Sequence, residues 1–188
     1  MILYPTETLY ALGVNALDAN ELAKMYELKD RDASKYSSWL VRTMEDVKRY
    51  AVVSEVAEKI ARAYLPGKLT LILPALPHIQ NNLISKDRTI GFRISSDPVA
   101  QKVIADFMEE FDTPLTCTSA NVSGSSTLGT VGEILQQFGS RTKIITKIVD
   151  DGPRKGLAST IVKVIGEDIT ILREGDITEA EIWGVIGL

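Results

Sequence analysis

Short apolar runs alternate along the chain with segments in which apolar residues recur every three or four positions. The runs predict β-strands at residues 2–4, 39–41, 69–73, 89–94, 115–118, 144–149, 160–165 and 169–173. The periodic segments predict helices at residues 18–28, 43–50 and 54–65, and further helices that start at residues 97, 130 and 178. Because strands and helices alternate without a break or a repeat, we expect a single α/β domain over residues 1–188 with a twisted, mixed sheet.

Short polar side chains mark where several of these helices begin. They predict caps at Thr43, Ser54 and Asp97, and capping boxes that start at Thr130 and Thr178. Glycine and proline predict the ends of two helices, at residues 66–67 and at 139. Residues 74–88 carry prolines and a pair of asparagines and predict a loop or a short helix, whereas the two closely spaced strands after residue 160 predict an antiparallel hairpin.

Composition narrows the class of protein. With 188 residues, 45% of them hydrophobic, the chain has enough apolar surface for one well-cored domain. Its net charge of −4 argues against a generally basic nucleic-acid binder but leaves room for a local basic patch. The one cysteine, Cys117, excludes an internal disulfide and a cysteine-based zinc cluster. The one histidine, His78, falls in a predicted exposed loop, which argues against a Ser-His-Asp triad.

Several localisation and nucleotide signals are absent from the sequence. No apolar run reaches the roughly 18 residues that span a bilayer, and no secretory leader precedes the first predicted strand. We therefore expect a cytoplasmic protein with no membrane partner. The chain also lacks the phosphate-binding motifs G-x-x-x-x-G-K-[ST] and G-x-G-x-x-G, and the nucleophile elbow G-x-S-x-G.

Three cations fall within seven residues directly after the predicted helix 18–28. They are Lys29, Arg31 and Lys35. Most short charge runs are solvated helix ends, and this is the simpler interpretation. The alternative is a grip on phosphate oxygens, because arginine offers a planar fork of donors and lysine a compact point charge.

Polar stretches follow two predicted strands. Residues 118–124 offer hydroxyls, an amide and a flexible glycine where open α/β sheets place ligand loops, although an ordinary polar loop has the same composition. Residues 5–13 are read most simply as a strand–turn–helix connection in which Thr6 or Thr8 caps the helix. Ser159 and Arg173 lie next to later strands and could face the same cleft, or could be a turn residue and a surface cation.

Taken in order, these pieces resemble one family, the YrdC-like threonylcarbamoyl-AMP synthases. The resemblance covers essentially the whole chain, and seven motifs in order are far more specific than any one of them. The motifs are Pro5-Thr6-Glu7-Thr8-x-Tyr10-x-Leu12-Gly13, Lys29-x-Arg31 with Lys35, Leu65-Pro66-Gly67-x-Leu69-Thr70, Arg93, Thr118-Ser119-Ala120-Asn121-x-Ser123-Gly124, Ser159-Thr160 and Leu172-Arg173-x-Gly175.

The resemblance implies a fold and a reaction. The fold is a twisted, mixed open sheet with helices packed around a concave, positively lined cleft. The reaction, a nucleotidyl transfer, forms threonylcarbamoyl-AMP and pyrophosphate from L-threonine, bicarbonate and ATP with Mg²⁺. The product feeds the threonylcarbamoyladenosine modification of tRNA through a downstream tRNA threonylcarbamoyl-transferase. Direct contact with tRNA or double-stranded RNA is a further implied partnership.

The resemblance also assigns roles to residues. Lys29 and Arg31 would be catalytic by neutralising charge on the departing pyrophosphate. The ATP-binding positions are Lys29, Arg31, Lys35, Thr89, Cys117, Ser119, Asn121, Thr127 and Arg173. The threonine-binding positions are Thr8, Arg93, Cys117 and Ser159, with Arg93 on the amino-acid carboxylate and Cys117 contributing its backbone. Mg²⁺ would be held by ATP phosphates, with no direct protein ligand.

The chain departs from the family pattern at three places near the cation run. Asp32 replaces the usual proline, Tyr36-Ser37 replaces Pro-Leu after Lys35, and Leu40 falls where some members carry a histidine that contacts threonine. The chain also begins almost at the first motif, without the helix that usually precedes it. Two alternatives therefore stay open: an RNA-binding module, and a paralogue with a different acceptor. A third, the carbamoyl-transfer proteins that mature hydrogenases, is disfavoured because those chains are much longer and carry zinc-finger cysteines.

Overall fold

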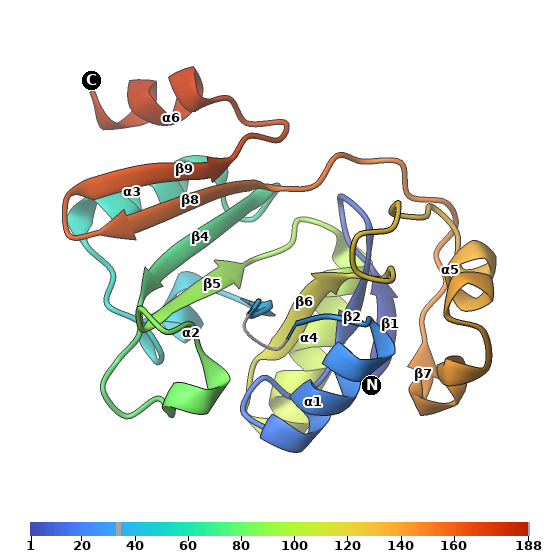
Figure 1. The fold of residues 1–188 in the computed structure, drawn as a ribbon. Helices are drawn as coiled ribbons and strands as arrows, with labels where there is room; N and C mark the ends of the chain where they lie inside the picture. The colour runs from blue at the N-terminus through green and yellow to red at the C-terminus, as the bar shows by residue number, and fades with distance from the viewer. Residues whose placement is uncertain (33–34, 188) are drawn as a thin grey trace.

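The computed structural model describes residues 1–32 and 35–187, so Ala33 and Ser34 of the cation run lie outside the described residues. Figure 1 shows a sheet with helices on both sides. The strands are β1 (Ile2–Pro5), β2 (Tyr10–Gly13), β3 (Ser38–Leu40), β4 (Leu69–Pro74), β5 (Thr89–Arg93), β6 (Leu115–Ser119), β7 (Lys147–Ile148), β8 (Thr160–Ile165) and β9 (Asp168–Arg173). The α-helices are α1 (Ala19–Leu28), α2 (Met44–Lys48), α3 (Glu55–Tyr64), α4 (Pro98–Phe111), α5 (Val131–Phe138) and α6 (Glu179–Ile186).

The strands form one mixed sheet in the order β7-β1-β2-β6-β3-β5-β4-β8-β9. Neighbours β1 and β7, β3 and β5, and β4 and β8 run parallel, and the other pairs run antiparallel. The predicted mixed sheet and C-terminal hairpin are therefore confirmed. The ends of the order are β7 and β9, which leaves the sheet open.

The stretch from Pro5 to Gly13 corrects the sequence prediction. It forms a strand–turn–strand hairpin, in which β2 pairs antiparallel with β1, and no helix follows the turn. All four residues of β2 are buried, so the strand lacks the alternation of polar and apolar residues that would have revealed it. Glycine suits position 13 because a Cβ there would clash with Leu115, whose Cγ would lie only 2.6 Å away.

The helix caps were predicted correctly. Thr43, Thr130 and Thr178 each close a capping box, Ser54 and Asp97 cap α3 and α4 through their side chains, and Gly139 ends α5 with a positive φ of 59°. The predicted strand 144–149 is only partly correct. A 3₁₀ helix (Gly139–Ile144) occupies its start, and only Lys147–Ile148 pair with β1. A second 3₁₀ helix (Asn81–Leu83) lies in the predicted loop 74–88, where His78 is exposed in a turn.

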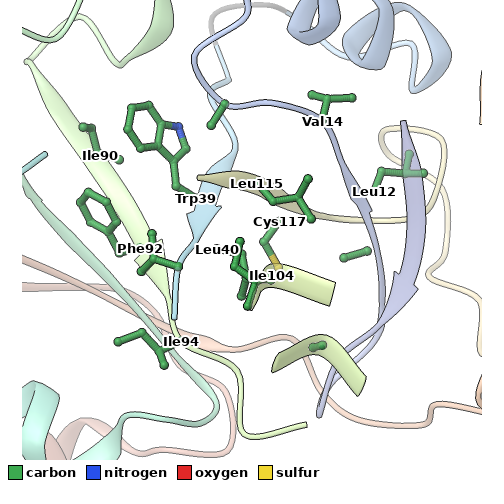
Figure 2. Packing of buried hydrophobic residues seen from close by; sticks show 14 of the residues in the cluster. Leu12, Val14, Trp39, Leu40, Ile90, Phe92, Ile94, Ile104, Leu115 and Cys117 are labelled. Atoms are coloured by element: carbon green, nitrogen blue, oxygen red, sulfur yellow. The ribbon is translucent and has the colours of Figure 1, made fainter. Parts of the chain in front are cut away.

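The hydrophobic core lies where β3, β5 and β6 meet α4. Figure 2 shows Trp39 and Phe92 with Ile90 and Leu115 in this cluster. The Trp39 and Phe92 rings meet edge to face, with centroids 5.9 Å apart, and Trp39 makes a similar contact with Tyr50 at 5.5 Å. These contacts fix the strands that carry the polar residues described below.

Residues 149–159 connect β7 at one edge of the sheet to β8 near the other. We call them the crossover segment. Figure 1 shows it, in orange, passing over the ends of the central strands. Arg154 N donates to Gly129 O at 2.8 Å, and Gly156 N donates to Thr8 O at 3.0 Å. These bonds connect the crossover segment to the loop before α5 and to the turn between β1 and β2.

Candidate functional site

One cleft of about 390 Å³ opens beside the carboxyl ends of β1 and β6 and the amino end of β3. Its walls come from distant parts of the chain: the β1–β2 turn, the segment after α1, the central strands, and the starts or ends of β8 and β9. The polar side chains around it are mainly hydroxyls and arginines. They include Thr6, Thr8, Arg31, Ser37, Ser38, Thr70, Ser85, Thr89, Arg93, Thr118, Ser119, Thr127, Ser159 and Arg173.

Most of the residues singled out from the sequence meet at this cleft. Thr8, Arg31, Thr89, Arg93, Cys117, Ser119, Thr127, Ser159 and Arg173 all line it. Three do not line it in the described residues: Lys29 and Asn121, which are buried behind the wall, and Lys35, which is exposed on the segment after α1. Leu40 is fully buried in the core, so its side chain takes no part in the cleft wall.

Arg93 is the buried cation of the cleft. It is 8% exposed and forms an ion pair with Glu7, whose other carboxylate oxygen accepts a hydrogen bond from Ser95. Nη2 of Arg93 also donates to Thr8 Oγ1 at 3.2 Å. Its Nε has no hydrogen-bond partner among the described residues. A buried guanidinium N–H left without a partner is costly, and Arg93 lines the cleft, where an acceptor on a ligand would offset part of that cost.

Arg173 and Ser159 form a second polar group at the cleft. Arg173 donates to Ser159 O from both Nε and Nη2, at 3.0 and 2.7 Å, and the Ser159 hydroxyl shares a hydrogen bond with Thr70 Oγ1 at 2.8 Å. Burial, and then the neighbouring charge of Arg93, lower the pKa of Arg173. Neither cause is an acidic side chain, so a negatively charged ligand would be favoured beside Arg173.

Arg31 holds the segment after α1. Its Nε donates to Lys35 O at 2.7 Å and its Nη2 to Tyr36 O at 3.2 Å. Burial lowers its pKa as well. The three arginines therefore share a cleft in which positive charge accumulates, and an anion with several negative oxygens would relieve that charge best.

Ser119 is the last residue of β6, one residue beyond the predicted end of this strand, and Asn121 lies in the loop that follows. The Ser119 hydroxyl donates to Asn121 Oδ1 at 2.6 Å, and the Asn121 amide donates to Val122 O at 3.0 Å and to Ser125 O at 2.8 Å. The Asn121 side chain therefore shapes the backbone of this loop, while Ser119 reaches the cleft.

The side chain of Lys29 has an unusually low pKa. Burial first, and then the positive charge of Arg31, lower its pKa to about 7. Because the unfolded chain keeps an ordinary lysine pKa near 10.5, the unfolded state binds more protons between pH 7 and 10.5. The free energy of unfolding should therefore rise with pH in this window.

We expect this rise to disappear in Lys29→Met. The difference in unfolding free energy between the wild type and this variant should grow by up to about 1.4 kcal/mol per pH unit from pH 7 to 9.5. Urea unfolding at several pH values measures it. A difference that stays constant across the range would show that Lys29 keeps an ordinary pKa.

Sequence reasoning missed several residues at or behind the cleft. Glu7 and Thr70 lay inside quoted motifs but were given no role, and their partners Arg93 and Ser159 are far away in sequence. Ser37, whose buried hydroxyl has no partner among the described residues, also lines the cleft. The hydroxyl groups in these motifs could have indicated further cleft residues. Nothing in the sequence indicates that Glu7 pairs with Arg93.

One structural finding bears on membranes. Among the described residues, no helix is both long enough and apolar enough to cross a bilayer.

Comparison with known proteins gives relatives over the whole chain. A Methanocaldococcus jannaschii protein is 35% identical over 176 residues, which cover 93% of this chain and 79% of that protein. The threonylcarbamoyl-AMP synthase of Pyrococcus abyssi is 31% identical over 189 residues, which cover 100% of this chain but 54% of that protein.

The fold agrees with a solved structure of P. abyssi Sua5 complexed with L-threonine. The TM-score is 0.87 at 30% identity, over 99% of this chain and 53% of that one. The chain thus spans about half the length of these P. abyssi proteins. A family model described as "Telomere recombination", that of the Sua5, YciO and YrdC proteins, matches residues 1–175. The chain therefore belongs to the Sua5/YciO/YrdC family.

Proposed function

We propose that this chain is a threonylcarbamoyl-AMP synthase that uses L-threonine, bicarbonate and ATP and releases pyrophosphate. The observation that carries the proposal is the convergence of Arg31, Arg93 and Arg173 on one cleft walled with hydroxyls. A polyphosphate and an amino-acid carboxylate are the kinds of anion that such a cleft suits. The name of the P. abyssi relative and the threonine in the P. abyssi structure support the same reaction.

The threonine would bind where Arg93 lies. Its carboxylate would accept from the guanidinium of Arg93, whose Nε has no other partner in the described part of the chain. The hydroxyls of Thr8 and Ser159 line the same wall and are suited to the ammonium and hydroxyl groups of the substrate. Because Glu7 pairs with Arg93 and is itself held by the Ser95 hydroxyl, this end of the cleft is preorganised.

The ATP would bind between Arg31 and Arg173. Its phosphates would meet these two guanidiniums and the hydroxyls of Thr89, Ser119 and Thr127, which line the cleft. Lys35 is exposed on the neighbouring segment and could approach the terminal phosphates without lying in the wall. The arginines would stabilise the charge that develops on the leaving pyrophosphate.

The reaction needs positioning more than acid–base chemistry. The threonine amine attacks the carbon of bicarbonate and water leaves, which gives a carbamate. A carbamate oxygen then attacks the α-phosphorus as the bond to pyrophosphate breaks. We infer that the protein supplies orientation and charge stabilisation, which together account for large rate enhancements without a covalent intermediate.

Mg²⁺ would arrive on the ATP phosphates. Among residues 1–32 and 35–187, no group of three His, Cys, Asp or Glu residues is placed to hold a metal ion. The hydroxyl of Ser119, at the cleft wall, fits a cation that keeps most of its water and phosphate ligands. When bound, Mg²⁺ would neutralise negative charge on the phosphate oxygens.

The product would pass to a tRNA threonylcarbamoyl-transferase in the cytoplasm. We include this step in the proposal because a mixed anhydride of a carbamate and AMP is an activated acyl donor. This step needs no direct contact of this chain with tRNA or double-stranded RNA, which belongs to the alternative function of an RNA-binding module.

Pyrophosphate release is the measurement that tests the function. With ATP, Mg²⁺ and bicarbonate, we expect release that depends on L-threonine. Arg31→Ala should lower kcat/KM about 10²- to 10³-fold, because one donor to the developing charge is lost. Arg62→Ala is the matched control, since Arg62 lies on α3 with its side chain 78% exposed.

Each other outcome has a definite meaning. Release that proceeds with another amino acid but not with threonine would show a paralogue with a different acceptor. Neither release nor ATP binding, together with RNA binding that weakens steeply with salt, would favour the RNA-binding alternative.

A further inference from the structure

Lys29 lies behind the cleft wall rather than in it. It is the residue that ends α1, and it is 1% exposed. Its Nζ donates to the backbone oxygens of Ser119 and Asn121, the latter at 2.8 Å. Its own backbone oxygen accepts from Ser123 N at 2.7 Å. A single residue of α1 therefore binds three backbone atoms of the loop that follows β6.

After Ala120, few other bonds join that loop to distant parts of the chain. Ser119 still pairs with Ala11 of β2, and Ala120 N donates to Tyr10 O at 2.9 Å. Beyond these residues the chain leaves the sheet, and its other bonds are short-range ones within the loop and one from Val122 N to Gln137 Oε1 at 2.8 Å. The loop presents Ser119 to the cleft. The position of that hydroxyl therefore depends both on the pairing of β6 with β2 and on the bonds from Lys29 to the backbone of the loop.

A phosphate contact by Lys29 would be expensive. The ammonium group would have to leave two carbonyl oxygens and emerge from full burial, and the two carbonyls would lose their partner. Arg31, two residues later, already lines the cleft and needs no such movement. The two cations therefore have different surroundings although they share one motif.

We propose that Lys29 is a positioning residue that holds the backbone of residues 119–123, and through it the Ser119 hydroxyl, and that it makes no direct contact with ATP. This role rests on the proposed function, since it concerns the ATP side of the same cleft. It separates Lys29 from Arg31, which lines the cleft itself.

Hydrogen–deuterium exchange without any nucleotide tests the role directly. In Lys29→Met, amides of residues 119–125 should exchange at least about tenfold faster than in the wild type, because the loop loses two buried hydrogen bonds. In the matched variant Arg31→Met, the exchange of these amides should stay unchanged. ATP affinity, measured by calorimetry with MgATP, should fall in both variants.

A third variant separates the hydrogen bonds that Lys29 donates to the loop from its positive charge. Lys29→Gln keeps two N–H donors on a side chain one atom shorter and removes the positive charge. It should retain most of the loop protection and most of the ATP affinity. If Lys29→Gln protects the loop as the wild type does but loses as much ATP affinity as Arg31→Met, Lys29 contacts phosphate and the proposal is overturned.

The exchange and affinity measurements remain decisive if a variant fails to fold or if the proposed activity is absent. If Lys29→Met does not fold, Lys29→Gln alone decides between the two roles. If the wild type releases no pyrophosphate, the exchange comparison still decides whether Lys29 holds the loop, because it uses no substrate. If Lys29→Met folds, unchanged exchange of residues 119–125 in this variant would overturn the proposal, whether or not the wild type releases pyrophosphate.

Discussion

Arg93→Met is expected to lower the free energy of unfolding by about 3–5 kcal/mol and to remove threonine-dependent turnover. The stability loss arises because Glu7, whose side chain is only 9% exposed, would remain as a buried carboxylate without its cation. The loss of turnover arises because the amino-acid carboxylate would lose its fork of donors. Urea unfolding and pyrophosphate release measure the two effects.

A double variant separates these effects. Glu7→Gln/Arg93→Met should recover much of the stability, because no unpaired charge is left in the interior, but none of the activity. Glu7→Gln alone should raise KM for threonine more than KM for ATP, since Arg93 would lose its anchor. Equal changes in both KM values would show that Glu7 has only a general structural role.

Gly156→Ala is expected to damage the threonine end of the cleft through the crossover segment. A Cβ on residue 156 would lie 2.6 Å from Thr8 O and 2.8 Å from Thr8 Cα, where only backbone could give way. The hydrogen bond from Gly156 N to Thr8 O would be lost with this shift. We expect a loss of about 1–3 kcal/mol in unfolding free energy and a raised KM for threonine.

Gly132→Ala is the matched control for this substitution. Gly132 lies in the first turn of α5, and a Cβ there would meet nothing within 4 Å. Alanine should stabilise the helix by up to about 1 kcal/mol and leave both KM values unchanged. A Gly156→Ala variant as stable and active as Gly132→Ala would mean that the crossover segment can move freely from Thr8.

The local features of the fold could be predicted from sequence because their signals are local. A cap such as Thr43 and its partner Asp46 lie three residues apart, so the pattern and the contact coincide. The prediction failed for β2, since a four-residue strand buried on every position shows no periodicity. It also failed at the start of the predicted strand 144–149, where the apolar residue Ile144 belongs to a 3₁₀ helix.

The candidate site also has features that the sequence indicates and features that depend on the folded structure. Most residues chosen through the resemblance to a family pattern line the same cleft, including Thr127, which carries no local signal of its own. What the pattern could not give is the depth of each side chain. Lys29 and Arg31 look alike in sequence, yet one is buried against carbonyls and the other faces the cleft. Depth depends on contacts made across the fold, such as that of Lys29 with a loop 90 residues away.

The crossover segment also has a consequence for how the chain folds. Strands β7 and β8 are consecutive in sequence, yet β1, β2, β6, β3, β5 and β4 lie between them in the sheet. Both of their parallel pairings join the last third of the chain to much earlier residues, Lys147 to Ile2 and Thr160 to Leu69. This topology has a high contact order, so folding should be slow compared with a helical bundle of equal length. During synthesis, the first strand emerges from the ribosome long before its outer neighbour and must stay unpaired on that side until residue 147 follows.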